Sequence, residues 1–106
     1  MLHYQQLGKI SLQQIARKMS HAVADCFQIA NRGYIREGYF ADLVMVDTNT
    51  STEVTQNNIF YKCGWSPLEN FRFPASIEKT MVNGRLVWNQ GQFDETVKGQ
   101  RLAFDR

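Results

Sequence analysis

The sequence predicts an α+β fold, in which an N-terminal helix precedes a small, mainly antiparallel β-sheet. Residues 9–29 repeat apolar side chains at steps of three and four, which is the period of an amphipathic helix. After Asn31 the pattern changes to short runs rich in β-branched and aromatic residues, separated by glycines and polar turns. Asn83-Gly84, between two such runs, is typical of a tight antiparallel hairpin.

The predicted helix begins beside Ser11, whose hydroxyl can accept a hydrogen bond from a free amide of the first turn, and Gln14 completes a capping box. Ser20 is a second possible N-cap, so residues 9–29 form either one helix or two, the second running through Phe27. An isolated helix of this length is marginal in water, so its apolar stripe must pack on another element. The stripe consists of Leu12, Ile15, Ala16, Met19, Ala22, Val23, Cys26 and Phe27.

The first predicted strand is Leu43–Val46, a continuous apolar run that is typical of a strand buried on both faces. Polar residues 47–55 then form a loop with a short edge strand near Val54. We expect Gly91 to end the last strand of the hairpin and residues 100–104 to add one more. The sheet is therefore small and has open edges.

The hairpin itself joins residues 76–83 to residues 85–89. A two-residue type I′ turn needs positive φ at both central positions, which Asn83 and Gly84 tolerate. These two residues are the predicted turn.

Composition is that of one globular domain. A chain of 106 residues is long enough for one domain but not comfortably for two. Such a domain buries somewhat under about 70% of its unfolded surface, so an independent core is possible. The 12 Lys and Arg residues and 10 Asp and Glu residues are scattered, which argues against a nucleic-acid partner.

Nothing in the sequence points to a membrane. No run of about 18 apolar residues is present. The first ten residues lack the charged and apolar regions of a signal peptide. Cys26 and Cys63 are too few for a disulfide framework, so we expect reduced thiols and a cytoplasmic location.

Residues that carry chemistry are sparse. His3, expected near a frayed terminus, and His21 stand in no spacing such as H-x-H, whereas a zinc ion needs three or four convergent ligands. No histidine near Cys63 in sequence can act as its base, so a semi-buried cysteine packed with Trp65 is favoured over a nucleophile. Asp42 is expected to hold a turn or a strand start. We therefore expect no catalytic, metal-binding or cofactor-binding residue in this chain.

Residues 61–71, YKCGWSPLENF, gather aromatic residues with a cysteine, a glycine and a proline in a pattern that fits neither helix nor strand. Together with GYIREGYFADLVMVD at 33–47 and the tail GQRLAFDR at 99–106, this stretch resembles the C-terminal portion of a dihydroorotase, in the amidohydrolase superfamily. The G-x-I-x-E-G-x-x-A-D-L-V pattern is shared with allantoinases and dihydropyrimidinases, whereas YKCGWSPLE resembles dihydroorotases more specifically.

The resemblance implies an architecture. A dihydroorotase combines a metal-bearing (β/α)8 barrel with a small β-sandwich built from both chain ends, and it interconverts N-carbamoyl-aspartate and dihydroorotate in pyrimidine biosynthesis. Residues 1–30 would then be the terminal helical segment of the barrel, and residues 31–106 the C-terminal strands of the sandwich. The histidines, carboxylated lysine and aspartate that hold zinc in the family match no position here. Zinc is thus expected in the full-length parent and not in this chain.

The resemblance also assigns a role to the odd stretch, as a connection that packs toward the missing barrel. The residues expected at that packing interface are Tyr61, Cys63, Trp65, Pro67, Leu68 and Phe71. Two positions depart from the family. Val23 replaces the usual proline, so two helices could run on as one, and Asn70 replaces the usual glycine in a turn that asparagine tolerates.

Three hypotheses follow for the function. The chain is the C-terminal portion of a dihydroorotase and inert alone, or a stand-alone non-catalytic assembly or binding module derived from an amidohydrolase, or the tail of another amidohydrolase, against which YKCGWSPLE argues. The first two stay open. The partners expected are the missing barrel and further copies of this chain, through exposed strand edges or the helix stripe.

Overall fold

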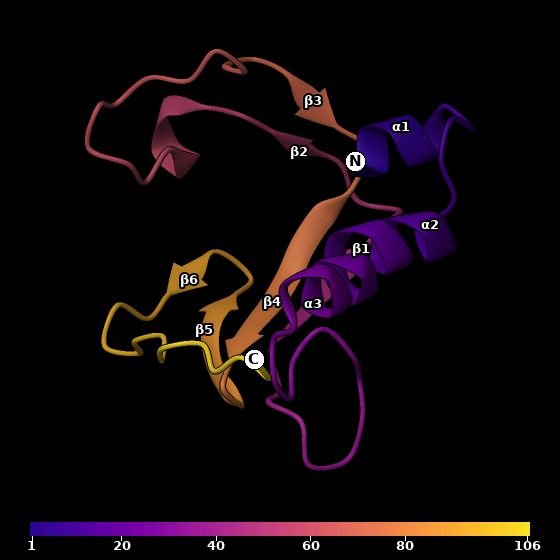
Figure 1. The fold of residues 1–106 in the computed structure, drawn as a ribbon. Helices are drawn as coiled ribbons and strands as arrows, with labels where there is room; N and C mark the ends of the chain where they lie inside the picture. Colours follow the sequence, from indigo (N-terminus) through magenta and orange to yellow (C-terminus); the bar gives the residue numbers. More distant parts are fainter.

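The computed structural model describes residues 1–106 and shows a helical segment beside a mainly antiparallel sheet (Figure 1). The α+β prediction is confirmed at this level. The elements are α1 (Leu2–Gln6), α2 (Leu12–Ala16), the π-helical η1 (Arg17–His21), α3 (Ala22–Phe27), β1 (Leu43–Asp47), β2 (Thr52–Glu53), the 3-10 helix η2 (Gln56–Asn58), β3 (Arg72–Phe73), β4 (Ser76–Val82), β5 (Arg85–Asn89) and β6 (Gln92–Phe93).

One helix runs without a break through α2, η1 and α3. The amide of Gln14 donates to Ser11 Oγ at 3.1 Å, and the amide of Ser11 donates to Gln14 Oε1 at 2.9 Å, which confirms the capping box. Ser20 lies inside η1 and caps nothing, so a second helix starting there is wrong and the helix continues through Val23. The helix ends where Gln28 adopts a left-handed conformation, with φ of 55°.

A four-stranded antiparallel sheet has the order β1-β4-β5-β6. Asn83 and Gly84 have φ of 52° and 77°, so both predicted turn positions carry the positive φ of a type I′ hairpin. The second hairpin strand, β5, ends before Gly91 as predicted, but Gln90 and Gly91 form a second tight turn that leads into β6, which was not foreseen. The signal was present, since glycine is the residue that best tolerates such a turn.

A second, two-stranded sheet pairs β2 with β3 and stands at one end of the molecule (Figure 1). The short strand near Val54 is thus close to its predicted place, whereas β3 was not foreseen. The strand expected at 100–104 does not form. Phe104 instead makes a single antiparallel bridge with Ile29, and the tail lies along the end of the helix.

Asp42 and Arg32 tie the loop after the helix to the hairpin. Asp42 Oδ1 accepts from the amide of Asn83 at 2.8 Å, and Arg32 forms an ion pair with Asp42. Arg32 also donates to Asn83 Oδ1 at 2.9 Å, and its guanidinium lies 4.1 Å from the centre of the Phe40 ring. Asp42 therefore holds a turn, as expected.

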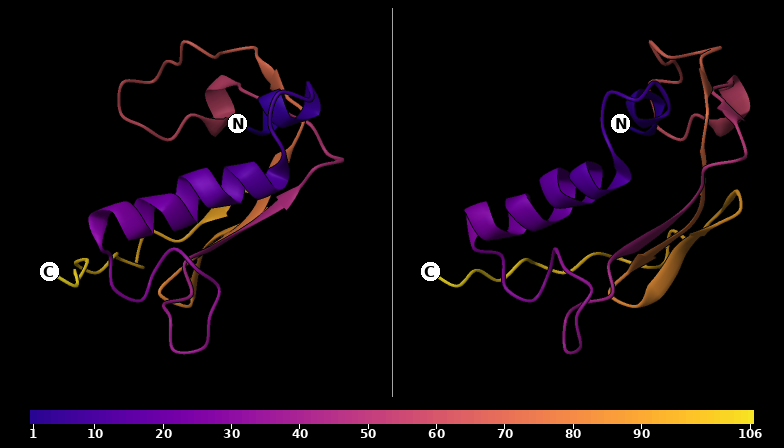
Figure 2. Two further views of the ribbon diagram at one scale, coloured as in Figure 1. Left: turned by 45° about the vertical axis from the view of Figure 1, so that its right-hand side comes forward. Right: turned by 90° about the vertical axis from the view of Figure 1, so that its right-hand side faces the viewer.

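Only one residue is buried. Ala24 is 5% exposed, and it packs against Gly33, where an added Cβ would lie 2.3 Å from the Ala24 Cβ. The helical segment otherwise lies to one side of the sheet and makes few contacts with it (Figure 2). The independent core that the chain length permits does not form, because the helix and the sheet do not cover each other.

The solvent-accessible surface area shows how far this chain is from a compact domain. The chain of 12.3 kDa exposes 8357 Å², whereas a folded monomer of that mass exposes about 6,100 Å². Its radius of gyration is 15.5 Å, against about 13 Å for a compact domain of this length. About 2,300 Å² of surface that a compact domain would bury is therefore open.

Strand β1 shows the same feature locally. Val44 is 59% exposed and Met45 is 58% exposed, although they belong to opposite faces of the strand. The prediction that Leu43–Val46 is buried on both faces is wrong for this chain. The residue pattern is right for burial, but the chain supplies no layer on either face of β1.

Candidate interaction surface

The acidic, thiol and imidazole groups of this chain are dispersed. No three His, Cys, Asp or Glu side chains come together in a group that could hold a metal ion. The His3 ring stands edge-on against Phe71, with ring centroids 5.3 Å apart, and His3 lies in helix α1. The expectation that His3 lies near a frayed terminus is therefore wrong. The His21 ring stacks on Tyr34 at 4.2 Å. The two histidines thus serve separate aromatic contacts.

A shallow cavity of about 330 Å³ lies at the end of α3. The Tyr34 hydroxyl donates to Asp25 Oδ2 at 2.7 Å, and this hydrogen bond to the carboxylate raises the pKa of Tyr34 above its ordinary value. Arg36 lies over the Tyr34 ring at 4.1 Å, and Arg32 is engaged with Asp42. Asp25 and Arg36 beside the cavity are therefore each engaged with Tyr34, and Arg32 is engaged with Asp42.

The more unusual feature is the arm, which we define as residues 54–71. Its base is fixed because the Val54 amide donates to the Phe71 carbonyl at 2.9 Å and the Asn70 amide donates to the Val54 carbonyl at 2.8 Å. Asn70 has φ of 66°, so asparagine sustains the positive φ of this turn, as expected. The two ends of the arm are thus held together by backbone hydrogen bonds.

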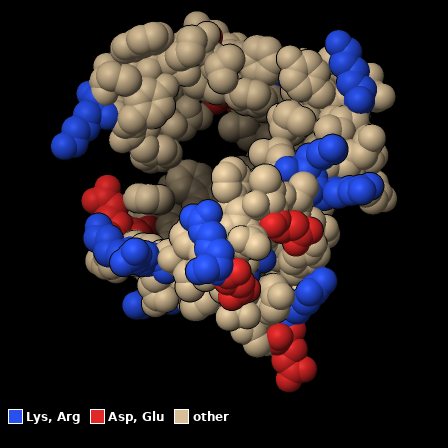
Figure 3. Space-filling view, viewed as in Figure 1, with Lys and Arg blue, Asp and Glu red and all other residues tan.

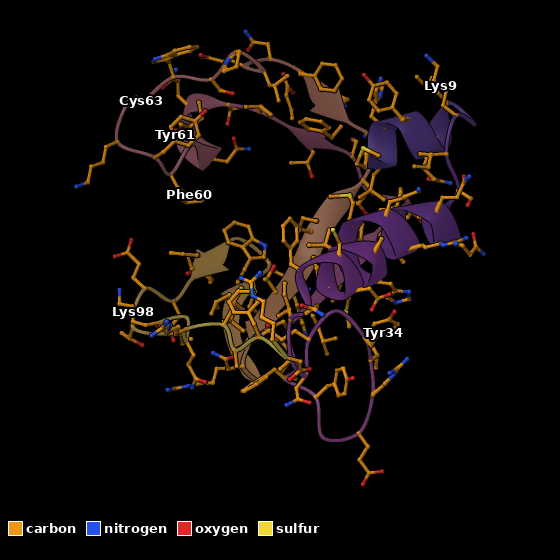
Figure 4. All side chains as sticks on the ribbon, in the orientation of Figure 1. Lys9, Tyr34, Phe60, Tyr61, Cys63 and Lys98 are labelled. Carbon is orange, nitrogen blue, oxygen red and sulfur yellow. The ribbon has the colours of Figure 1, made fainter.

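The arm presents apolar side chains that the chain leaves open. Trp65 is 60% exposed, and Tyr61, Cys63, Pro67 and Leu68 are exposed as well. Figure 4 shows Tyr61 and Cys63 on the arm, away from α2 and α3. The expectation of a semi-buried Cys63 is wrong here, since its one polar contact is a distant 3.8 Å to the Trp65 carbonyl.

Phe71 differs from the other interface residues, because it is half-buried at the base of the arm. Its ring lies 4.8 Å from that of Phe73, in addition to the contact with His3. Phe60 was missed by the sequence reasoning. Its ring reaches from the arm to Trp88 of β5 at 5.6 Å and to Phe93 of β6 at 6.3 Å. An aromatic residue directly before Tyr61 was the available signal.

Two further apolar surfaces are open. The helix stripe exposes Leu12, Met19, Val23 and Phe27, and β1 exposes Leu43, Val44 and Met45. In the view of Figure 3, mostly uncharged atoms line the hollow between the arm and the sheet, and the Lys and Arg side chains are scattered around it. Patches of this extent on a soluble domain mark contact sites. The packing of Tyr61–Phe71 against a barrel stays a prediction.

Comparison with known proteins places these features in context. The model of the amidohydrolase family matches residues 1–87. A dihydroorotase of Pyrococcus furiosus is 30% identical over 96 residues, which are 91% of this chain and 23% of that protein. An allantoinase of Desulfitobacterium hafniense is 31% identical over 89% of this chain and 21% of its own length. A dihydroorotase of Endomicrobium trichonymphae is 33% identical over 76% of this chain and 19% of its own length.

The chain thus spans less than a quarter of the length of these relatives. None of its helices is both long enough and apolar enough to cross a membrane.

Proposed function

This chain belongs to the amidohydrolase family, and on that premise we propose that it is the non-catalytic C-terminal portion of a dihydroorotase, packed against the metal-bearing barrel. One observation carries the proposal. The chain leaves about 2,300 Å² more surface open than a compact domain of its mass, and it matches 23% of the length of a dihydroorotase. An open surface of that size is what we expect where this chain packs against the rest of a larger fold.

The donor groups of this chain do not fit a zinc site. A catalytic zinc needs three protein ligands that converge, and no three candidate side chains do so here. In the proposed enzyme the zinc, which supplies the activated water of cyclic amide hydrolysis, is held by residues outside this chain. We derive no chemical step from residues 1–106.

The proposed work of this chain is packing. The arm would lay Tyr61, Trp65 and Leu68 on the barrel, and the helix stripe would complete the barrel wall. Large apolar side chains that are exposed in this chain would become buried in the complete protein, where each stabilises the fold by about 1.5–3 kcal/mol.

Allantoinase is the second candidate, favoured by the 31% identity to an enzyme of that name. That identity lies between the 30% and 33% found for the two dihydroorotases, so the choice of substrate needs a direct measurement. YKCGWSPLE remains the sequence argument for dihydroorotase.

The deciding experiment compares the 106-residue chain with the complete product of its gene, each with added zinc, on dihydroorotate and on allantoin. The proposal expects turnover of dihydroorotate by the complete product and none by the chain. Turnover of allantoin alone would select the second candidate. Inactivity of both proteins on both substrates would favour an assembly module, and turnover by the chain alone would overturn the assignment of a non-catalytic role.

A matched pair of variants tests the packing role in the complete product. Trp65→Ala should lower its stability by about 3–5 kcal/mol, because the tryptophan is buried against the barrel. Glu37→Ala is the control, since Glu37 is exposed, carries a charged side chain and lies outside the arm. If both variants unfold at the same denaturant concentration, the arm is not an internal interface.

A further inference from the structure

The turn Asn83-Gly84 has a chemical property besides its shape, because this dipeptide is prone to deamidation. Asn83 is the only asparagine of the chain that glycine follows. Glycine has no side chain to hinder its own backbone nitrogen when that nitrogen approaches the amide carbon of the preceding asparagine. Asparagine is also one of the residues that are lost chemically at high temperature. The question is whether the fold leaves this pair free to react.

Deamidation consists of a ring closure and a hydrolysis. The backbone nitrogen of Gly84 gives up its proton to a solvent base and attacks Cγ of Asn83, and the side-chain amide leaves as ammonia, so that a cyclic imide forms. Water then opens this ring at either carbonyl and leaves aspartate, or isoaspartate, in which the main chain runs through the former side chain. One amide and one water thus give one carboxylate and one ammonium ion, and no group is oxidised or reduced.

Hydrogen bonds hold both reacting groups in place. The amide of Gly84 donates to the Ala41 carbonyl at 3.0 Å, so the proton that must leave is held in a hydrogen bond. The amide of Asn83 donates to Asp42 Oδ1 at 2.8 Å, which fixes the backbone on the other side of the residue. Arg32 Nη2 donates to Asn83 Oδ1 at 2.9 Å, which fixes the side-chain amide itself. Bringing the Gly84 nitrogen onto Cγ of Asn83 therefore breaks contacts of both the backbone and the side chain.

Arg32 has two opposite effects on this reaction. Its hydrogen bond draws electrons from the Asn83 carboxamide, which by itself favours attack at Cγ. It also anchors the carboxamide, because the Arg32 side chain is only 10% exposed and is held by Asp42 and by the Phe40 ring, whose centre lies 4.1 Å from the guanidinium. The anchoring effect dominates, since a polarised carbonyl is not attacked while the Gly84 nitrogen keeps its proton and cannot approach.

We propose that Arg32, Asp42 and the Ala41 carbonyl form a clasp that keeps Asn83 from deamidating, so that Asn83 is a latent modification site which reacts only when the clasp opens. The rate of reaction is then the rate in the open chain multiplied by the fraction of time for which the clasp is open. Isoaspartate lengthens the main chain of the turn, so the hydrogen bonds of the clasp cannot all form again. This inference uses only contacts among residues 32–84 and is independent of the enzymatic assignment.

The experiment incubates the complete product of the gene at mildly alkaline pH, in native buffer and in guanidinium chloride, and follows deamidation at Asn83 by peptide mass spectrometry. We expect the folded protein to react at least about a hundredfold more slowly than the unfolded protein, because the hydrogen bonds of the clasp must open first. Arg32→Lys is the decisive variant, since lysine keeps a positive charge beside Asp42 but lacks the second arm that reaches Asn83. It should raise the rate in native buffer by at least about fivefold.

Arg36→Lys is the matched control. Arg36 belongs to the same loop as Arg32 but lies over the Tyr34 ring, at 4.1 Å from its centre, so the same substitution leaves the clasp intact. This variant should react within about twofold of the natural protein. Equal rates for the folded and the unfolded natural protein would overturn the proposal without any variant having to fold. So would a rate in Arg32→Lys that is unchanged or lower, or an equal acceleration in Arg36→Lys.

Discussion

Gly33→Ala is the substitution for which the structure gives the sharpest energetic expectation. Gly33 has φ of 84°, and a Cβ placed on it would lie 2.3 Å from the Cβ of Ala24 and 3.0 Å from the carbonyl oxygen of Ser20. The first obstacle is a methyl group on the only buried residue, and the second is backbone of the helix. Neither can move away by a simple rotation of a side chain.

Two costs combine in this variant. A residue other than glycine in the left-handed region costs about 1–2 kcal/mol. Forcing an extra methyl group into a closed contact costs a further amount of about 1–3 kcal/mol. We therefore expect Gly33→Ala to lower the free energy of unfolding by about 2–5 kcal/mol, and to release the loop at 31–42 from the helix.

Gly38→Ala separates the two costs. Gly38 has nearly the same φ, 82°, but nothing lies within 4 Å of an added Cβ, so only the conformational cost applies. Urea unfolding followed by circular dichroism gives both values, in a buffer with trimethylamine N-oxide, which raises the stability of all variants by exclusion from their surfaces. Ala24→Gly should recover about 1–3 kcal/mol in the Gly33→Ala background, beyond its own effect. Equal losses for the two glycine variants would refute the reasoning.

Three further perturbations follow from local contacts. Asp42→Ala should destabilise the chain by about 1–3 kcal/mol in urea unfolding, because it leaves the Arg32 guanidinium, whose side chain is 10% exposed, without its carboxylate. Ser11→Ala should cost about 1 kcal/mol of helix stability, read as reduced helicity by circular dichroism, because the capping box is lost. The Thr50 hydroxyl donates to Asp47 at 2.6 Å and holds the pKa of that carboxyl below its usual value. Thr50→Val should raise the pKa of Asp47 in a carboxyl NMR titration. In the natural chain, the stability that this contact supplies is fully present above the ordinary carboxyl pKa of about 3.9. It should be lost as the pH falls through the lowered pKa of Asp47 in the folded chain.

Each of these expectations can fail visibly. An Asp42→Ala variant as stable as the natural chain would mean that Arg32 reaches solvent without penalty. Unchanged helicity in Ser11→Ala would mean that tertiary contacts alone begin the helix. An unchanged titration of Asp47 in Thr50→Val would place the cause of its lowered pKa in the backbone amide of Asn49.

The parts of the fold that the sequence could predict depend on neighbours in the chain. The capping box of Ser11 needs only a residue three positions on, and the hairpin at Asn83-Gly84 needs only two residues that tolerate positive φ. Of the two alternatives left open at Ser20, the second helix does not form, because a cap is only a local preference and the helix continues through η1.

Burial could not be predicted, because it depends on atoms that other elements supply. The apolar run in β1 has the composition of a strand covered on both faces, yet both faces are open. The arm shows the same limit, since Tyr61 and Trp65 are large aromatic residues that this chain leaves exposed. Arg32 also hydrogen-bonds to Asn83, 51 positions away, a contact that no short-range pattern predicts.

The two tight turns of the sheet have a consequence for the order of folding. Strands β4, β5 and β6 follow one another through residues 76–93, joined only by Asn83-Gly84 and Gln90-Gly91. Contacts of such low order form early, because little loop entropy is lost before each hydrogen bond is gained. Strand β1 must wait until residues 48–75 close into a loop, since Asp47 pairs with Ser76. The three-stranded meander is thus the natural nucleus of the sheet, and β1 joins it as the last and most easily lost strand.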